Sequence, residues 1–410
     1  MVGTQNRASE YPWLVLGDGE SPVTYAQLFE EIAHPTKTSA SPRELCATLV
    51  TIVRALVFGQ DLTCVDGRAT VSGEASTGQG ELGGESADVV PTPAELIATR
   101  LRENCRSRVT FQTSGTSGLP KQYTHTLEHL RRGVVVGEKH RCDVWGLAYP
   151  PTTMAGFQVC LQAFCNGNGI VDLRGVRREE VLRRCREWGV NRLSATPTFF
   201  RMLLPVRPPF GAMRSCTLGG EVADSRLVQD LREAFTGARI HNIYALTEAG
   251  TVLRAEGEEF SVPGELLNLV KIEEGRVWLN RALLAADQRT GEWFDTGDLV
   301  EVTCGNPLRF RMLGRAGTVI NVGGAKVNPE EVERVLLTFA GIVGARVAGR
   351  RNSVTGMVLE AEVVWRDEAR PEEELRHFLQ SRLPPAWIPR ILRAVDRLVL
   401  TSSGKVRRDE

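Results

Sequence analysis

The feature that most restricts the fold of this chain is a predicted strand that runs directly into a loop of glycines and hydroxyl residues. The strand spans residues 108–112, and the loop, TSGTSGLPK, spans residues 113–121. Glycines let the backbone approach a phosphate closely, N–H and hydroxyl groups donate to its oxygens, and Lys121 adds a positive charge. The loop is not a Walker A motif, because GxxxxGK[ST] is absent. A phosphate-binding loop and an ordinary Ser/Gly-rich surface loop both fit this pattern.

The pattern of apolar residues predicts two domains. From residue 108 to about residue 300, helical segments alternate with short apolar segments, as in an α/β domain with substantial sheet. Residues 67–87 are rich in Gly, Ser and Glu without periodicity, which predicts a flexible loop. Near Gly314 the pattern changes to a hairpin followed by alternating helices and strands. We therefore expect a large N-terminal α/β domain over residues 1–313, with β-sheets flanked by helices, and a small mobile α+β domain over residues 314–410.

Composition excludes several classes of partner and compartment. Lys plus Arg total 50 and Asp plus Glu total 50, so no overall positive field favours nucleic acid or an anionic membrane. The nine cysteines are scattered and form no CxxC pair, which favours a reducing compartment, and we expect a cytoplasmic protein. The longest apolar stretch, residues 47–58, contains Arg54 and is too short to span a bilayer.

Further motifs follow the 113–121 loop in a recognisable order. They are LGGE at 218–221, IYALTE at 243–248, DTGD at 295–298, a segment from 314 to 331 that contains NVGGAKVNPEE, and LTSSGKVR at 400–407. In this order and at these separations the chain resembles the adenylate-forming superfamily, which comprises acyl- and aryl-CoA ligases, luciferases and peptide-synthetase adenylation domains. The loop resembles the family's [ST]SGT[ST]GxPKG motif, and the later segments resemble YGxTE, TGD, GRxDxxIKxxGxRVxPxEIE and LPxTxxGKxxR.

The resemblance implies an ATP site. The loop is expected to hold the β- and γ-phosphates, Tyr244 to stack on adenine, and Asp298 to accept both ribose hydroxyls through its two carboxylate oxygens. Arg315 is also expected to reach the ribose. The full set of implied nucleotide contacts is Thr113, Ser114, Gly115, Thr116, Ser117, Gly118, Lys121, Gly219, Gly220, Glu221, Tyr244, Thr247, Asp298 and Arg315.

The resemblance also implies the catalytic groups. Thr247 is expected to contact the α-phosphate, and Glu248 to hold Mg²⁺, a hard cation that suits carboxylate and phosphate oxygens. Lys405 is expected to enter with the small domain and to bridge the acid and the α-phosphate, where it stabilises charge that develops in the transition state.

The chain departs from the family pattern at several positions. Only about a hundred residues precede the phosphate loop, which predicts a reduced first subdomain. Gln122 and Ala245 replace motif glycines. Gly317 stands where relatives carry a hinge Asp or Lys, so backbone rotation stays possible but a side chain that could favour one pose is absent.

The acid pocket is expected, by family position, near five residues: Thr153, Met154, Phe157, Thr196 and Thr251. Residues 149–157 contain no acidic side chain, whereas relatives that activate amino acids commonly place an Asp there to hold the ammonium group. We therefore expect an aromatic or unsaturated carboxylic acid.

Three functions remain open at this point. The first is an acid–thiol ligase that uses ATP and Mg²⁺ and transfers the acyl group to CoA or to the phosphopantetheine of an acyl carrier protein. The second is an ATP-dependent diazotase of secondary metabolism, which activates nitrite and transfers it to an arylamine. The third is a catalytically degenerate nucleotide-binding module. Nitrite-dependent AMP release with an arylamine distinguishes the second, and ATP binding without turnover distinguishes the third.

Overall fold

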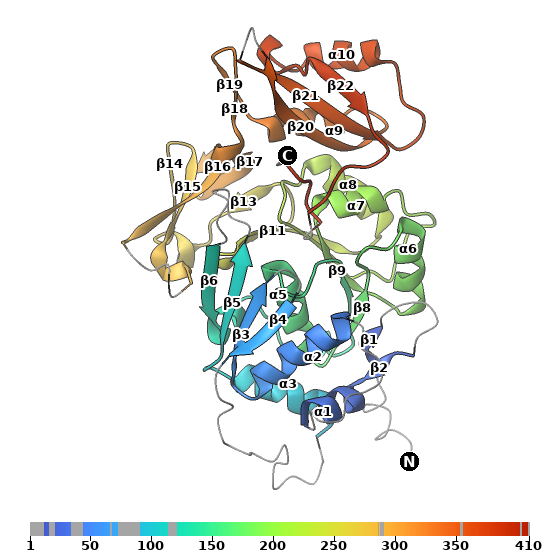
Figure 1. Cartoon of the computed structure of the whole chain (residues 1–410), viewed down its shortest axis with the longest axis vertical. Helices are drawn as coiled ribbons and strands as arrows, with labels where there is room; N and C mark the ends of the chain where they lie inside the picture. The colour runs from blue at the N-terminus through green and yellow to red at the C-terminus, as the bar shows by residue number, and fades with distance from the viewer. Residues whose placement is uncertain are drawn as a thin grey trace.

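We analysed a computed structural model of the chain. The structure describes residues 12–15, 21–33, 44–65, 68–72, 91–113, 121–285, 287, 291–352, 356–401 and 404–408. Figure 1 shows a larger part built from the first three quarters of the chain and a smaller part built from the last quarter. No helix in the described residues has the length and apolar character needed to cross a membrane.

An eight-stranded sheet forms the centre of the larger part, in the order β12-β11-β10-β9-β7-β8-β1-β2. Neighbouring strands from β11 to β1 run parallel, and the edge strands β12 and β2 are antiparallel to their neighbours. Parallel strands need crossover connections, and four helices supply them. The strands are β1 (Pro12–Val15), β2 (Val23–Thr24), β7 (Val144–Leu147), β8 (Gly169–Asp172), β9 (Arg192–Ala195), β10 (Ser215–Gly219), β11 (Arg239–Leu246) and β12 (Gly250–Ala255). The helices are α5 (Met154–Phe164), α6 (Arg178–Glu187), α7 (Pro197–Leu203) and α8 (Ser225–Ala234).

A four-stranded sheet, β4-β3-β5-β6, lies beside the first, with helices α1, α2 and α3 below it in the view of Figure 1. Its strands are β3 (Asp61–Val65), β4 (Arg68–Ser72), β5 (Arg108–Thr113) and β6 (Lys121–Thr126), and the helices are α1 (Tyr25–Ala33), α2 (Glu44–Val57), α3 (Pro93–Glu103) and the short α4 (Leu127–Arg131). The apolar faces of α1, α2 and α3 share one core with α5, through residues such as Leu28, Leu49 and Phe164.

One expectation from the sequence is corrected in this sheet. Residues 68–72 belong to the segment predicted to be a flexible loop, yet they form strand β4, in antiparallel register with β3. The reason is pairing with β3, because this half-buried strand offers its free backbone groups to a segment that contains the strand-forming residues Thr70 and Val71. Residue 67 and residues 73–87 of the same segment lie outside the described residues.

A five-stranded antiparallel sheet, β13-β17-β16-β15-β14, joins the main sheet on one side. Phe260 packs against Tyr244 of β11 at a ring-centroid distance of 6.2 Å and stacks on Phe310 at 5.9 Å, so aromatic rings tie the two sheets together. Its strands are β13 (Glu259–Ser261), β14 (Val270–Glu273), β15 (Arg276–Asn280), β16 (Trp293–Gly305) and β17 (Leu308–Arg315).

The smaller part has its own core. Helix α9 packs on the β20-β21-β22 sheet through residues such as Val332, Leu336 and Val347, and Leu379 of α10 joins them. The elements are β18 (Ile320–Val322), β19 (Ala325–Val327), α9 (Pro329–Leu337), β20 (Ile342–Asn352), β21 (Gly356–Trp365), α10 (Glu372–Gln380) and β22 (Ile391–Ala394). The predicted fold class, a large α/β part followed by a small α+β part, is confirmed. We propose that the boundary between them lies near Gly314, at the end of β17.

Candidate active site

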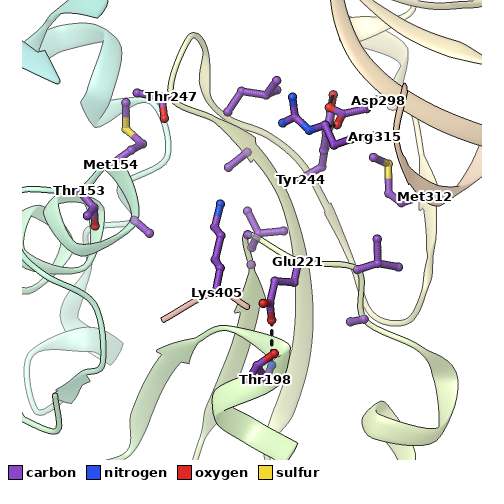
Figure 2. Close-up of a pocket in the computed structure, with 18 of the residues that line it drawn as sticks. Thr153, Met154, Thr198, Glu221, Tyr244, Thr247, Asp298, Met312, Arg315 and Lys405 are labelled. Carbon is purple, nitrogen blue, oxygen red and sulfur yellow. Dashed lines mark hydrogen bonds and ion pairs between the residues drawn. The ribbon is translucent and has the colours of Figure 1, made fainter. Parts of the chain in front are cut away.

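A cavity of about 1990 Å³ lies where the carboxyl ends of the parallel strands meet the five-stranded sheet and the smaller part. Residues at or after the ends of β7, β10 and β11 line it, including Tyr149, Gly219 and Leu246. Ligands of open α/β sheets bind at this edge of the sheet. Figure 2 shows side chains from distant parts of the chain that point into this space.

Most of the residues singled out from the sequence line this one cavity. They are Thr113, Lys121, Thr153, Met154, Gly219, Gly220, Glu221, Tyr244, Thr247, Glu248, Thr251, Asp298, Arg315, Gly317 and Lys405. Ser114, Gly115, Thr116, Ser117 and Gly118 lie outside the described residues. Phe157 and Thr196 do not line the cavity.

The expected phosphate loop connects the two strands of a hairpin. Thr113 ends β5, Lys121 begins β6, and these two residues are paired directly across the hairpin. Gln122, which replaces a family glycine, pairs with Gln112 as a regular strand residue. The two ends of the loop are thus fixed to the sheet, and both face the cavity.

A buried carboxylate links the main eight-stranded sheet to the five-stranded sheet. Asp298 is 4% exposed, its Oδ2 accepts a hydrogen bond of 2.7 Å from the Tyr244 hydroxyl, and its Oδ1 lies 2.6 Å from Nε of Arg315. Burial raises the pKa of Asp298, while Arg315 and Tyr244 oppose that rise. An ionised carboxylate offers about four lone-pair sites, so two remain for further donors. This carboxylate can therefore bind a vicinal pair of hydroxyl groups, as a ribose presents.

The turn after β11 carries Thr247 and Glu248 into the cavity. The Thr247 carbonyl oxygen lies 2.7 Å from Nε2 of the buried His125, and since a carbonyl can only accept, Nε2 carries the proton. The Glu248 carbonyl accepts from the Ala285 N–H at 2.8 Å. Both backbone groups are thus held, so the two residues are fixed in position at the cavity. His125 was not identified from the sequence, and no motif marks it.

Glu248 is also the residue that fits Mg²⁺. Among the described residues, no cluster of three or more His, Cys, Asp or Glu side chains could hold a metal ion. Mg²⁺ bound to a nucleotide needs only one or two protein carboxylates, because phosphates and water fill its other positions. The Glu248 carboxylate faces the Tyr123 hydroxyl, whose pKa is raised by burial and by this carboxylate. The Glu248 carboxylate, which lines the cavity, can serve as one such ligand.

Lys405 reaches the cavity from the C-terminal segment (Figure 2). Its side chain passes close to Gly220. Gly220 has φ +86°, and a Cβ atom there would lie 2.7 Å from Cε of Lys405. The positive φ favours glycine at this position, and the missing side chain leaves room for the lysine chain. The surrounding protein lowers the pKa of Lys405 by desolvation, and Glu221 opposes this effect, although the side chain remains open to solvent along the cavity.

One face of helix α5 forms the wall opposite these charged groups. Met154, Ala155, Gln158, Val159 and Gln162 line the cavity at the spacing of one helical face. No lining residue between positions 145 and 162 is an Asp, Glu, Lys or Arg. Periodicity counted from Met154 would have identified Gln158 and Gln162 from the sequence.

Two expected pocket residues lie elsewhere. Phe157 is on a different face of α5 and packs edge-on against Phe111 in the core, with ring centroids 5.4 Å apart. Thr196 caps helix α7, where its hydroxyl accepts from the Phe199 N–H at 3.1 Å and donates to the Gly404 carbonyl at 3.0 Å. A helical face and a helix cap are set by the local fold, and alignment with a family motif does not report them.

Asn242 is a further lining residue that the sequence reading missed. It is 5% exposed and lies two positions before Tyr244 on β11, hence on the same face of the strand. Within the described part of the chain its amide has no hydrogen-bond partner. Residues two positions apart on a strand face the same side, so the position of Tyr244 in the sequence could have indicated Asn242.

Comparison with known proteins identifies relatives. The family model described as AMP-binding enzyme matches residues 108–293, and the model described as AMP-binding enzyme C-terminal domain matches residues 331–405. The chain is 26% identical over 330 residues to 2-succinylbenzoate–CoA ligase of Bacillus licheniformis, which covers 72% of the chain and 68% of that protein. It is 28% identical over 369 residues to phenyloxazoline synthase of Mycolicibacterium paratuberculosis, which covers 78% of the chain and 31% of that protein.

The fold is similar to solved structures of the same kind. An anthranilate CoA ligase in complex with anthranoyl-AMP superposes with a TM-score of 0.60 at 21% sequence identity, over 74% of this chain and 66% of that one. Against another curated relative, acetyl-coenzyme A synthetase of Bacillus subtilis, the chain spans 59% of the length.

The raised pKa of Asp298 generates a prediction about nucleoside binding. We expect the affinity for adenosine to fall, by about tenfold, as the pH falls through that raised pKa, because protonation removes a charged acceptor for the ribose hydroxyls. Adenosine is the probe since it has no phosphate and does not titrate near neutral pH. Isothermal titration calorimetry over a pH series measures the effect, and Asp298→Asn, which cannot titrate, is the control. A flat profile in the unsubstituted protein contradicts the prediction.

Proposed function

Because the chain belongs to the AMP-binding enzyme family, we propose that it is an AMP-forming ligase that joins a carboxylic acid to a thiol in two steps. In the first step ATP adenylates the acid and pyrophosphate leaves. In the second step the thiol of CoA, or of a carrier protein's phosphopantetheine, takes the acyl group and AMP leaves.

The observation that carries this proposal is the position of Lys405 in the same cavity as Asp298 and Glu248. A nucleotide whose ribose binds Asp298, and whose phosphates reach Thr247 and the ends of the 113–121 loop, would bring its α-phosphate toward Lys405. A cation there favours the added negative charge of a pentavalent transition state. The arrangement therefore supports chemistry at the α-phosphate, which is the step that forms an adenylate.

The proposed first step needs only these groups and ATP. A carboxylate oxygen of the acid attacks the α-phosphorus, a new P–O bond forms, and the bond to the pyrophosphate oxygen breaks. Lys405 remains charged and donates to the reacting oxygens, while Thr247 orients the α-phosphate. Glu248 would hold Mg²⁺, which, when bound, neutralises charge on the phosphates.

The wall formed by α5, together with residues of β7 and of the segment after it, supports an acid with a flat, uncharged body. Trp145, Tyr149, Met154 and Val159 supply aromatic and apolar surface, and charged residues are absent from this stretch of the lining. The ammonium group of an amino acid would lack a carboxylate partner here, at a substantial desolvation cost. An aromatic or unsaturated carboxylic acid is the substrate class that we propose. Two relatives carry aromatic acids in their names, 2-succinylbenzoate and anthranilate.

An acid panel tests the proposal. Aromatic, unsaturated and amino acids, together with nitrite, are incubated with ATP and Mg²⁺, and pyrophosphate and AMP are measured with and without CoA. We expect aromatic or unsaturated acids to release pyrophosphate and CoA to accelerate AMP formation. Nitrite-dependent AMP release with an arylamine and none with CoA would instead indicate the diazotase reaction. ATP binding with no turnover on any acid would indicate a degenerate nucleotide-binding module.

Replacement of Lys405 separates the two half-reactions. Lys405→Ala removes a cation aimed at the α-phosphate, so adenylate formation should slow by about 10²- to 10³-fold. Transfer from chemically prepared adenylate should slow far less, because we expect the smaller part to rotate between the two half-reactions, an alternation that carries Lys405 away from the reacting atoms in the second one. Single-turnover assays of each half measure the split. Equal slowing of both halves in a folded variant means that domain alternation is the wrong model.

Gly317 provides a second test of alternation. It lies in a short 3-10 helix, Ala316–Thr318, and a Cβ atom there would meet no atom within 4 Å. Gly317→Ala should therefore keep the melting temperature, or raise it slightly through a less flexible unfolded chain. The narrower φ/ψ range should slow acyl transfer several-fold and adenylation less. Unchanged transfer would show that the rotation occurs elsewhere.

A further inference from the structure

Lys405 lies on a hairpin that is anchored to the smaller part. The hairpin comprises the described residues 399–401 and 404–408, closed by the hydrogen bonds from the Arg407 N–H to the Val399 carbonyl and from the Thr401 N–H to the Lys405 carbonyl, each 2.8 Å long. Arg408 makes a bidentate ion pair with Glu333 of α9, at 2.8 and 2.6 Å. The Arg346 side chain of β20 donates to the Arg407 carbonyl at 2.8 Å. These anchors all belong to the smaller part, so they can move with it.

The larger part holds the hairpin at a different place, on the two residues that flank Lys405. The Gly404 carbonyl accepts from the Thr196 hydroxyl at 3.0 Å. The Val406 N–H donates to Oε1 of Glu221 at 2.9 Å. Glu221 is itself fixed, because its other oxygen accepts from the Thr198 N–H at 3.0 Å, in the first turn of α7 (Figure 2). Backbone groups on both sides of Lys405 are thus bound by α7 and by the residue that follows Gly220.

We propose that Thr196 and Glu221 form a clamp that positions Lys405 through its backbone and holds the smaller part in the pose that makes the adenylate. The inference rests on the proposed function, since it assigns a positioning role within that reaction. Glu221 is then a positioning residue of the first half-reaction, in addition to any contact with adenine.

The chemistry of the two contacts suits this role. A carboxylate accepts from two N–H groups at once, and such charge-assisted hydrogen bonds are stronger than neutral ones. The contacts bind main-chain atoms, so they fix the direction of the Lys405 side chain without using its ammonium group. The contact of Glu221 joins residues 185 positions apart in the sequence, and the contact of Thr196 joins residues 208 positions apart. Both contacts therefore exist only while the hairpin lies in the cavity.

Hydrogen exchange tests the clamp without any knowledge of the acid. In Glu221→Gln the side chain has nearly the same shape, but its amide oxygen can accept only one of the two N–H groups. We expect amide exchange in the peptide spanning residues 399–408 to rise by about tenfold to hundredfold, which corresponds to one charge-assisted hydrogen bond. The melting temperature is measured in parallel to show that the variant is folded.

The chain offers a matched control. Glu258 also lines the cavity and also accepts from the N–H at the start of a helix, Ser225 of α8, at 3.2 Å. Within the described residues it makes no contact with the 399–408 hairpin. Glu258→Gln should therefore leave exchange of that peptide unchanged. If Glu221→Gln and Glu258→Gln change it equally, or if neither changes it, the clamp is disproved.

The half-reactions supply the functional readout. On an acid that the protein accepts, Glu221→Gln should slow adenylation by about tenfold or more and slow transfer from prepared adenylate much less. Thr196→Ser keeps the hydroxyl and should behave as the unsubstituted protein, whereas Thr196→Ala should act in the same direction as Glu221→Gln. Equal loss in both halves overturns the positioning role. Faster hairpin exchange in a protein that adenylates no acid would disprove the proposed function while the clamp itself stands.

Discussion

The Asp298 carboxylate is buried, and two other segments of the molecule supply the partners that compensate it. Tyr244 comes from the main parallel sheet, Asp298 from β16, and Arg315 from the last residue of β17, where the chain passes toward the smaller part. Burying a carboxylate without partners costs several kcal/mol, so none of these segments can shift alone without exposing that cost. The contacts of Asp298 with Tyr244 and Arg315 therefore set how the eight-stranded and five-stranded sheets meet, and the cavity lies beside that junction. The same carboxylate keeps lone pairs for a ligand, so one group serves both the fold and binding.

Much of this arrangement could be predicted from the sequence. The order of motifs indicated that Lys121, Tyr244, Asp298 and Lys405 would meet, and all four line one cavity. The α/β and α+β parts followed from the apolar pattern, and the hairpin that precedes α9 did as well. The prediction of the fold class is confirmed, because the apolar pattern reports the period of each helix and strand directly. The roles of the four site residues stay predictions.

The rest depends on contacts that a linear pattern does not contain. Residues 68–72 contain only two apolar residues, Ala69 and Val71, and pairing with the neighbouring strand β3 makes them a strand. Phe157 stands next to a lining residue in sequence, but the helix turns it toward Phe111. Glu221 was expected only against the nucleotide, whereas its two oxygens hold the N–H groups of Thr198 and Val406. In each case the decisive partner comes from another segment. For Glu221 the two partners lie 23 and 185 residues away in the sequence.

The place of β1 in the main sheet has a consequence for how the protein forms during synthesis. Residues Leu14 and Val15 pair with Ile170 and Val171 of β8, on an inner strand of the sheet. The ribosome adds about 5 to 20 residues per second, so β1 waits roughly 10 to 30 s for its partner to be made, and longer until the partner leaves the exit tunnel. During that time β1 has only early-made neighbours such as β2, and Trp13 lacks Phe164, against which it packs with ring centroids 5.6 Å apart. Codon choice upstream of residue 170, or a chaperone that binds the emerging strand, would therefore change the yield of folded protein without altering a single amino acid.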